Sequence, residues 1–436
     1  MSFTLRLSTI FLALALLSVI FVASSNFFPY IGVKAYWFRL CVSLALIFFL
    51  GWVGFQSSNG EIRRLFKQTF SSPLVLATTI FAAIFVLASI FAYDPLAAFW
   101  SNLERGEGGF QMIYYYLFFL LLVLTGRDEK TWRLFLWTTL IAAVLVIGYG
   151  VSSFVGIINS GMSTAGGIFG QRFAGSLGNP AYLGSYMLFS LFFAGFLISG
   201  KGVKFGERLA LISLSILFFA FFLFAQTRGA FLGLIVSVVV FLLFYAFKNS
   251  VHRRSLIITA LILTLLFSTL IYFRESPAIK NMPVIGRLLR VSVFDRSVQS
   301  RLWVWQTAYE GWKERPILGW GPENFTKVFN DRFDIRHFVP DETSDTWYDR
   351  AHSVFFDYLV ETGILGLLSY LGVFAVFYRQ FFKQKIQSAL LFAFPVAYLI
   401  QGIVLFEILP IYLPFFFFLA FSVYRFQFAV GGVQND

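Results

Sequence analysis

Twelve long apolar runs constrain the fold of this chain more than any other feature. Each run is about 17 to 25 residues long, enough for a helix to cross a hydrocarbon core about 30 Å thick. The runs lie at approximately 8–27, 36–55, 73–92, 110–125, 132–154, 180–199, 208–226, 229–247, 255–273, 353–378, 387–405 and 408–425. The sequence therefore predicts an all-α polytopic membrane protein with about twelve transmembrane helices.

The composition excludes a soluble globular protein. Hydrophobic residues make up 58% of the chain, aromatic residues 20% and charged residues 13%, whereas about a quarter of a soluble domain is charged. The single cysteine, Cys41, lies inside a predicted span. We therefore expect neither a disulfide nor a thiolate metal cluster.

Basic residues orient the predicted spans. Five short loops on one side carry three Lys or Arg each: Arg63, Arg64 and Lys67; Arg127, Lys130 and Arg133; Lys201, Lys204 and Arg208; Lys248, Arg253 and Arg254; and Arg379, Lys383 and Lys385. The positive-inside rule assigns that side to the cytoplasm. Most of the +12 net charge is then a topology signal, and no nucleic-acid surface is needed to explain it.

The opposite ends of the spans then emerge outside, and they divide the chain into three parts. The external segments are 27–35, 93–109, 155–179, the Gln226–Arg228 turn and 274–352. Ala23-Ser24-Ser25 has the small residues of a signal-peptidase site, but we favour an uncleaved anchor. The predicted parts are nine helices in 1–273, an external loop in 274–352, and three helices with a short cytoplasmic tail in 353–436.

The external loop has the character of a soluble segment, with 12 Lys or Arg and 11 Asp or Glu. Apolar residues recur in it at helical steps: Val298, Leu302, Trp305, Tyr309 and Trp312. Pro316 ends this predicted helix, Gly319-Trp320-Gly321 makes a turn, and a second helix is expected over 322–331. Because the loop is small for an independent core, we expect it to cover the outer ends of the bundle.

Three arginines on the external side are candidates for binding a polyanion. Arg228 lies between two spans joined by almost no loop, Arg301 begins the amphipathic helix, and Arg172 precedes the sixth span. A guanidinium group offers a planar fork of donors that fits a phosphate. The alternatives are a membrane anchor for Arg228 and ordinary solvated side chains for the other two. Asn179-Pro180 is expected to cap and begin the sixth span.

His352 is the candidate catalytic residue because it stands where the external loop returns to the membrane. An imidazole is neutral near pH 7 and can accept a proton from a hydroxyl; the alternative is a histidine that caps the tenth span. Asp357 and Glu361 lie about 140° and 180° around the predicted helix from His352, so neither forms a dyad with it. A partner from the loop remains open: Asp345, Asp349 or Glu323.

Several short motifs follow one another in a fixed order. Thr227-Arg228-Gly229 heads a span; the loop has Arg301-x-x-x-Trp305 and Pro316-Ile-Leu-Gly-Trp-Gly-x-x-x-Phe325; then come His352-Ser353 and Gly363-Ile-Leu-Gly366. This order resembles the O-antigen ligase and polymerase superfamily of bacterial surface-polysaccharide enzymes. The resemblance is strongest over about 220–375. Leu367 departs from it, since the family usually has Gly, Thr or Tyr there.

The resemblance implies a membrane glycosyltransferase that uses a polyprenyl-diphosphate-linked glycan as donor. Arg228 and Arg301 would hold the diphosphate, with Arg172 a weaker candidate, and His352 would act near the acceptor hydroxyl. The site would face the periplasm from the cytoplasmic membrane. Ligation to lipid A core ranks ahead of glycan polymerisation and of transfer to a protein hydroxyl.

We expect no metal and no cofactor. The chain has no Asp-x-Asp, and the outer acids Asp94, Glu104 and Glu107 are too scattered for a confident Mg²⁺ site. The competing class of function is a transporter or flippase of lipid-linked sugars. Such carriers usually have two related halves, whereas the large loop after the ninth span breaks that symmetry.

Overall fold

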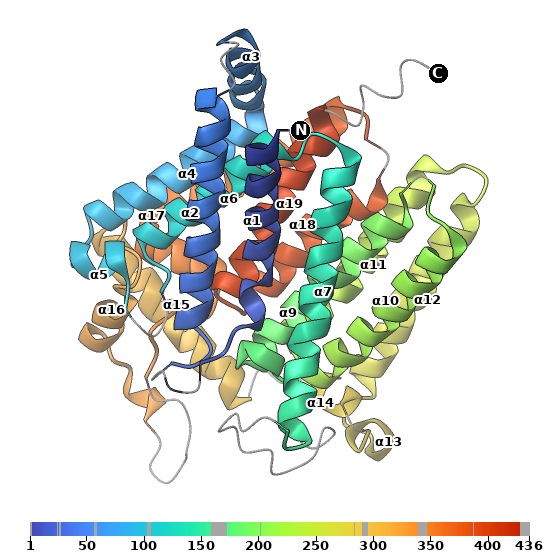
Figure 1. Cartoon of the computed structure of the whole chain (residues 1–436). Helices are drawn as coiled ribbons and strands as arrows, with labels where there is room; N and C mark the ends of the chain where they lie inside the picture. Colours follow the sequence, from blue (N-terminus) through green and yellow to red (C-terminus); the bar gives the residue numbers. More distant parts are fainter. Residues whose placement is uncertain are drawn as a thin grey trace.

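The computed structural model describes residues 2–23, 25, 28–55, 59–102, 106–157, 172–200, 202–282, 284–289, 295–338, 347–386 and 388–427. Within these ranges the regular structure is helical, without a strand. The predicted class is therefore confirmed: the chain is an all-α, multi-pass membrane protein (Figure 1).

Every predicted apolar run coincides with a helix. The helices are α1 (Phe3–Leu16), continued by η1 (Leu17–Ile20), α2 (Gly32–Phe55), α4 (Pro73–Ile90), α6 (Gly109–Thr125), α7 (Glu129–Phe154), α9 (Pro180–Ile198), α10 (Phe205–Ala225), α11 (Arg228–Lys248), α12 (Arg253–Tyr272), α17 (Val354–Lys383), α18 (Ala389–Gly402) and α19 (Leu409–Gln427). Among the described residues ten helices are long and apolar enough to span a membrane, whereas α6 and α18 are shorter. The first span begins earlier than expected and ends at Ile20, because Phe21 is extended.

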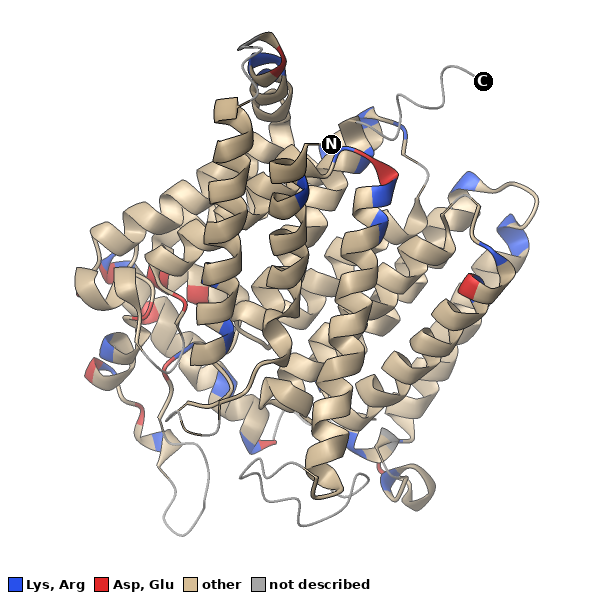
Figure 2. Cartoon of the chain, in the orientation of Figure 1, with Lys and Arg blue, Asp and Glu red and all other residues tan. Residues whose placement is uncertain are grey.

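Short helices fill several connections. They are α3 (Asn59–Phe70), α5 (Pro95–Trp100) and η2 (Gly175–Leu177). Asn179 caps α9 by accepting the Ala181 N–H, and Pro180 is the first residue of that helix, as expected. Figure 2 shows Lys and Arg near both ends of the bundle, with mostly uncharged helices between them.

The centre and the rim of the bundle differ in burial. Within the apolar windows of α19 and α9, 89% and 78% of residues are buried, whereas in the window of α12 only 6% of residues are buried. In Figure 1, α12 lies at the edge of the bundle, and it packs beside α11. The core around α19 is aromatic, and Phe418 stacks on Phe394 of α18 at 4.0 Å between ring centroids.

Helix α11 packs closely against α18 because two glycines face it. A Cβ at Gly229 would come within 2.5 Å of Val404 Cγ2, and one at Gly233 within 2.9 Å of the Ala397 carbonyl oxygen. These glycines therefore fix the position of the α11 N-terminus, and with it the position of Arg228.

The external segment forms α13 (Pro277–Lys280), α14 (Ile285–Leu289), α15 (Arg296–Glu314), α16 (Phe325–Asp331) and η3 (Ile335–His337). The two expected helices are thus present. Their side chains form a second apolar cluster with Val360 of α17; its other members are Val304, Ala308, Trp320, Phe325, Val328, Phe329, Tyr348 and Ala351. The division of the chain at 273 and 352 stays a prediction.

The buried face of α15 is not the expected stripe of large residues. Val304, Ala308 and Gly311 are buried, whereas Leu302 and Tyr309 are 47% and 45% exposed. Small residues occupy this buried face because α15 lies very close to its neighbours: a Cβ at Gly311 would come within 2.2 Å of Val328. Periodicity identified the helix, but it did not identify the face that packs.

Helix α17 is broken at Gly363, where φ is 65° and ψ is −169°. The segment Pro316–Gly321 binds the backbone groups that the break exposes. Trp320 N–H and Gly321 N–H donate to the carbonyls of Val360 and Glu361 at 2.9 and 2.8 Å. Ile364 N–H donates to the Pro316 carbonyl at 2.8 Å. The two glycine-containing motifs of the sequence are therefore halves of one junction.

We predict that Gly363→Ala destabilises the protein strongly. Gly363 has a positive φ, and a Cβ there would lie 2.2 Å from the Ile317 carbonyl oxygen, so an alanine adds both strain and a clash with backbone. Thermal unfolding of the purified protein in detergent measures the effect.

The matched control for this prediction is Gly372→Ala. Gly372 lies in the same helix, with open space within 4 Å of its Cβ position, so alanine should be neutral or slightly stabilising there. Equal unfolding temperatures for the two variants would contradict the junction described above.

Candidate functional site

The four residues singled out in the sequence line one cavity. Arg172, Arg228, Arg301 and His352 all border a space of about 360 Å³. They come from four separate parts of the chain: the segment before η2, the first residue of α11, helix α15 and the turn before α17. The fold thus brings together side chains that are up to 180 positions apart in sequence.

Arg172 is held against the turn between α10 and α11. Its Nε donates to the Ala225 carbonyl at 3.1 Å, and its Nη2 donates to Thr227 Oγ1 at 3.2 Å. Thr227 Oγ1 also donates to the Pro180 carbonyl at 3.0 Å. The tight turn that the sequence contains therefore positions Arg172 as well as Arg228.

Arg228 connects the membrane helices with the external segment. Its Nε donates to the Arg287 carbonyl at 3.2 Å, and its Nη1 lies 3.4 Å from Asp295 Oδ2. Both partners belong to the external segment, so its position over the bundle depends partly on this guanidinium group. The contact with Asp295 is long and about one third exposed, which makes it a weak ion pair.

Arg301 projects from α15 with donor capacity to spare. Its Nη1 is 3.4 Å from the Ser297 carbonyl oxygen. Its Nε is buried and has no hydrogen-bond partner among the described residues. Buried donors in proteins are normally paired, so an acceptor inside this cavity would satisfy an atom that the described chain leaves unsatisfied.

Arg287 is a cavity residue that the sequence analysis did not single out. It projects from α14 and lines the same space as the other three arginines. Twelve basic residues occur in the external loop, and no local motif distinguishes this one. Its position follows from the packing of α14 against α11, which sequence periodicity does not reveal.

The cavity is electropositive, and its arginines repel one another. Burial, with smaller contributions from the charges of Arg287, Arg301 and Arg228, lowers the pKa of Arg172 to about 10. Burial also lowers the pKa of Arg301, and Arg228 adds to the effect. These like charges are held together by the fold, so a bound anion relieves their repulsion.

The rest of the lining contains both polar and apolar residues. The polar groups include Asn179, Gln226 and Gln401, and the apolar ones include Val404 and Leu405. Phe406 packs against His352 edge to face, with 5.0 Å between ring centroids. Such a lining suits an amphiphilic ligand whose anionic group lies at the arginines.

His352 has an imidazole whose orientation is set by the backbone. Its Nδ1 lies 3.0 Å from the carbonyl oxygen of Arg350. A carbonyl only accepts hydrogen bonds, so Nδ1 carries the hydrogen and Nε2 of the neutral ring carries the lone pair. As expected, neither Asp357 nor Glu361 bonds the ring: Asp357 accepts the Ala351 N–H, and Glu361 binds Arg350.

Three loop acids are the suggested partners of His352. Glu323 pairs with Arg350, Asp349 is buried, and Asp345 lies outside the described residues. Among the outer acids, Asp94 caps α5, Glu107 is buried, and Glu104 is likewise outside the described part. No group of three or more His, Cys, Asp or Glu in the described ranges is arranged to hold a metal ion.

A second, much smaller cavity adjoins the first at Phe406. It measures about 20 Å³, room for about one water molecule. Buried acids line it: Glu107, Asp357, Glu361 and Glu407. Burial raises the pKa of Glu407 to about 7 and that of Glu107 to about 8. Glu107 accepts hydrogen bonds from Tyr115 Oη and from the Leu409 N–H.

We predict that Glu107 makes the protein less stable as the pH rises. Its pKa is about 8 in the folded chain against an ordinary value of 4.5, so the folded protein retains a proton that the unfolded chain loses between those values. The free energy of unfolding therefore falls through this window. Glu107→Gln should reduce the fall in unfolding temperature between pH 6 and pH 9.

In the Glu107→Gln protein, part of the pH dependence of the unfolding temperature remains, because Glu407 has a pKa of about 7. Glu310→Gln serves as the control, since Glu310 is a 45% exposed residue of α15; it should follow the wild type. A Glu107→Gln protein with the full wild-type pH dependence would contradict the assignment.

Comparison with known proteins gives a family match over part of the chain. Residues 213–371 match the O-antigen ligase family, a region that contains Arg228, Arg301 and His352 and ends within α17. No curated protein matches the chain. The family match over part of the chain supports the resemblance to the O-antigen ligase and polymerase superfamily that the sequence motifs predict.

Proposed function

We propose that this protein transfers a glycan from a polyprenyl diphosphate to an acceptor hydroxyl at the outer face of the cytoplasmic membrane. The diphosphate binds Arg228, Arg301 and Arg172, with Arg287 as a fourth contact, and His352 is the general base. The reaction uses neither a metal nor a cofactor. Ligation of the glycan to lipid A core is the favoured reaction.

One observation carries this proposal: three candidate arginines and the candidate base line a single cavity. A high content of basic residues would not by itself bring these arginines together, because such residues could lie anywhere on the external segment. A diphosphate offers several oxygens to converging guanidinium groups, and each charge-assisted hydrogen bond contributes about 1.5–3 kcal/mol. The unsatisfied Nε of Arg301 supports the same assignment.

The proposed reaction needs one base and stabilisation of one leaving group. The acceptor oxygen attacks the anomeric carbon and forms the new glycosidic bond. The bond from that carbon to the phosphate oxygen breaks, and its electron pair leaves with the lipid diphosphate. The acceptor proton passes to Nε2 of His352, while the arginines stabilise the charge of the leaving diphosphate.

The substitutions at the cavity should separate donor binding from catalysis. We expect His352→Ala to lower kcat about 10²–10⁴-fold with a small change in the donor KM. Arg301→Ala and Arg287→Ala should weaken donor binding about 10–100-fold each. The assay is glycan transfer by the purified protein in liposomes.

Arg336→Ala is the matched control for the arginine variants. Arg336 belongs to the same external segment, but it pairs with Asp334 and stacks on Trp303. Its removal should leave transfer unchanged. Full activity of His352→Ala, or equal losses in Arg301→Ala and Arg336→Ala, would refute the proposed roles.

The acceptor distinguishes the reactions that share this site. Wild-type protein is incubated with a polyprenyl-diphosphate oligosaccharide, first alone and then with lipid A core. Product that requires lipid A core identifies a ligase, and a glycan ladder on the carrier alone identifies a polymerase. Transfer to a protein hydroxyl would identify an oligosaccharyltransferase. Movement of the labelled donor across the bilayer without a new glycosidic bond would instead identify a transporter.

A further inference from the structure

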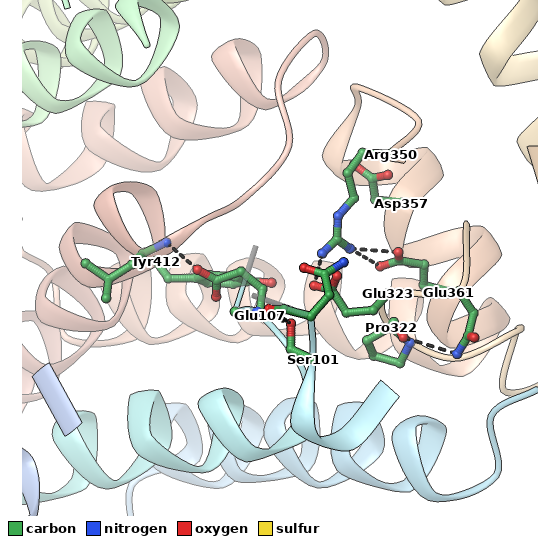
Figure 3. Close-up of polar contacts among 12 residues, drawn as sticks. Ser101, Glu107, Pro322, Glu323, Arg350, Asp357, Glu361 and Tyr412 are labelled. Carbon is green, nitrogen blue, oxygen red and sulfur yellow. Dashed lines mark hydrogen bonds and ion pairs between the residues drawn. The ribbon is translucent and has the colours of Figure 1, made fainter. Parts of the chain in front are cut away.

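Arg350 is a buried cation two residues before His352. It is 5% exposed, and its Nη1 donates to both carboxylate oxygens of Glu361 at 2.7 and 2.8 Å. Its Nη2 donates to Glu323. Figure 3 shows the guanidinium group of Arg350 pointing between these two carboxylates, with Asp357 beside its side chain. Glu361 belongs to α17, and Glu323 belongs to the connection between α15 and α16.

The backbone that follows Arg350 is fixed by other elements. The Ala351 N–H donates to Asp357 Oδ1 at 2.7 Å, and the Ala351 carbonyl accepts from the indole N–H of Trp305 at 3.0 Å. The Val354 N–H donates to the Leu405 carbonyl at 2.9 Å. Groups from α15, α17 and the α18–α19 connection therefore hold the short stretch that contains His352.

His352 itself adopts a backbone conformation that needs such support. Its φ is +56°, in the left-handed region. A non-glycine residue there costs on the order of 1–3 kcal/mol and persists where its surroundings over-determine it. Buried ion pairs contribute little net stability compared with apolar packing, so stability alone does not account for Arg350 and its two glutamates.

One atom connects this cluster to the imidazole. The carbonyl oxygen of Arg350 accepts the hydrogen bond from His352 Nδ1, and the guanidinium group of the same residue is held by Glu361 and Glu323. The peptide group that contains this carbonyl is held from two sides: its N–H, that of Ala351, donates to Asp357, and the side chain of Arg350 is bound by the two glutamates. Loosening the guanidinium group removes one of these two restraints, and the imidazole then has a less well placed acceptor to keep the hydrogen on Nδ1 and the lone pair on Nε2.

We propose that Arg350, held by Glu361 and Glu323, is a positioning residue for His352: it fixes the place and the tautomer of the imidazole that accepts the substrate proton. The assignment of a catalytic role to His352 rests on the proposed function. The hydrogen bond to His352 and its tautomer do not depend on the proposed function, because both can be measured in protein without substrate.

The kinetic test compares Glu361→Gln with Glu314→Gln. Glu361→Gln weakens the hold on Arg350, and we expect kcat to fall about 10²-fold, as misplaced catalytic groups do, with the donor KM little changed. Glu314→Gln also removes the carboxylate partner of an arginine, Arg332, but on the surface of the external segment; it should match the wild type. Glu323→Gln should resemble Glu361→Gln.

The spectroscopic test reads the tautomer directly. The chain has three histidines, His252, His337 and His352, so ¹⁵N-histidine NMR of the full-length protein gives few signals, and His352→Gln assigns the signal of interest. In the wild type at pH 8, His352 should carry its hydrogen on Nδ1. In Glu361→Gln it should become a mixture of tautomers, while His337, whose Nδ1 lies near Ser300 Oγ, stays unchanged.

Three results would overturn the proposal. The first is a wild-type His352 that carries its hydrogen on Nε2. The second is a folded Glu361→Gln protein with wild-type kcat and tautomer. The third is a fall in kcat in Glu361→Gln without any change in tautomer, which would indicate a purely structural role. If Glu361→Gln does not fold, a wild-type spectrum with the hydrogen of His352 on Nε2 would still overturn the proposal. Wild-type protein that transfers no glycan to any acceptor would refute the proposed function, and the tautomer measurement would stand apart from it.

Discussion

The structure depends on the junction between the broken helix α17 and the segment Pro316–Gly321. A helix interrupted at Gly363 leaves backbone donors and acceptors that must be paired when they are buried. The external segment supplies the partners from its own backbone, and Gly319 allows the approach: a Cβ there would lie 2.5 Å from the Glu361 backbone. Backbone pairing of this kind fixes position more tightly than side-chain contacts alone.

Several features of the site follow from that junction. It brings Glu323, which follows the docked segment, next to Glu361, which precedes the break, and both bind Arg350. It also sets α15 against the first turns of α17, so that Trp305 reaches the Ala351 carbonyl. Arg301 is carried on the same helix. The position of the arginine cavity relative to His352 is therefore a consequence of how one helix is interrupted.

Much of the fold was predictable because it depends on local signals. Apolar runs of membrane-spanning length give the helices, and Asn179-Pro180 gives a helix start whatever surrounds it. Arg228 and His352 stood out because each is a polar residue where the chain turns back into apolar sequence. The break at Gly363 was not predicted, because a glycine in an apolar run has the same sequence signature whether the helix bends there or packs closely.

The missed residues share a different property. Arg287 and Arg350 owe their positions to contacts between elements that are far apart in sequence, and the external loop contains ten other basic residues with similar local sequence. The buried face of α15 was also beyond the reach of periodicity, because close packing favours Ala308 and Gly311 over Leu302 and Tyr309. Helical periodicity reports where large apolar residues lie, and this interface is made by small ones.

Phe406 lines both cavities, with four arginines bordering one and buried acids the other. The second cavity is also lined by Arg350, and burial raises the pKa of Glu407 to about 7 and that of Glu107 to about 8, so much of its negative charge is neutralised. His352 lies against the ring of Phe406. An imidazolium ion formed there is repelled by the guanidinium groups that border the larger cavity, so these arginines favour the return of His352 to its neutral form.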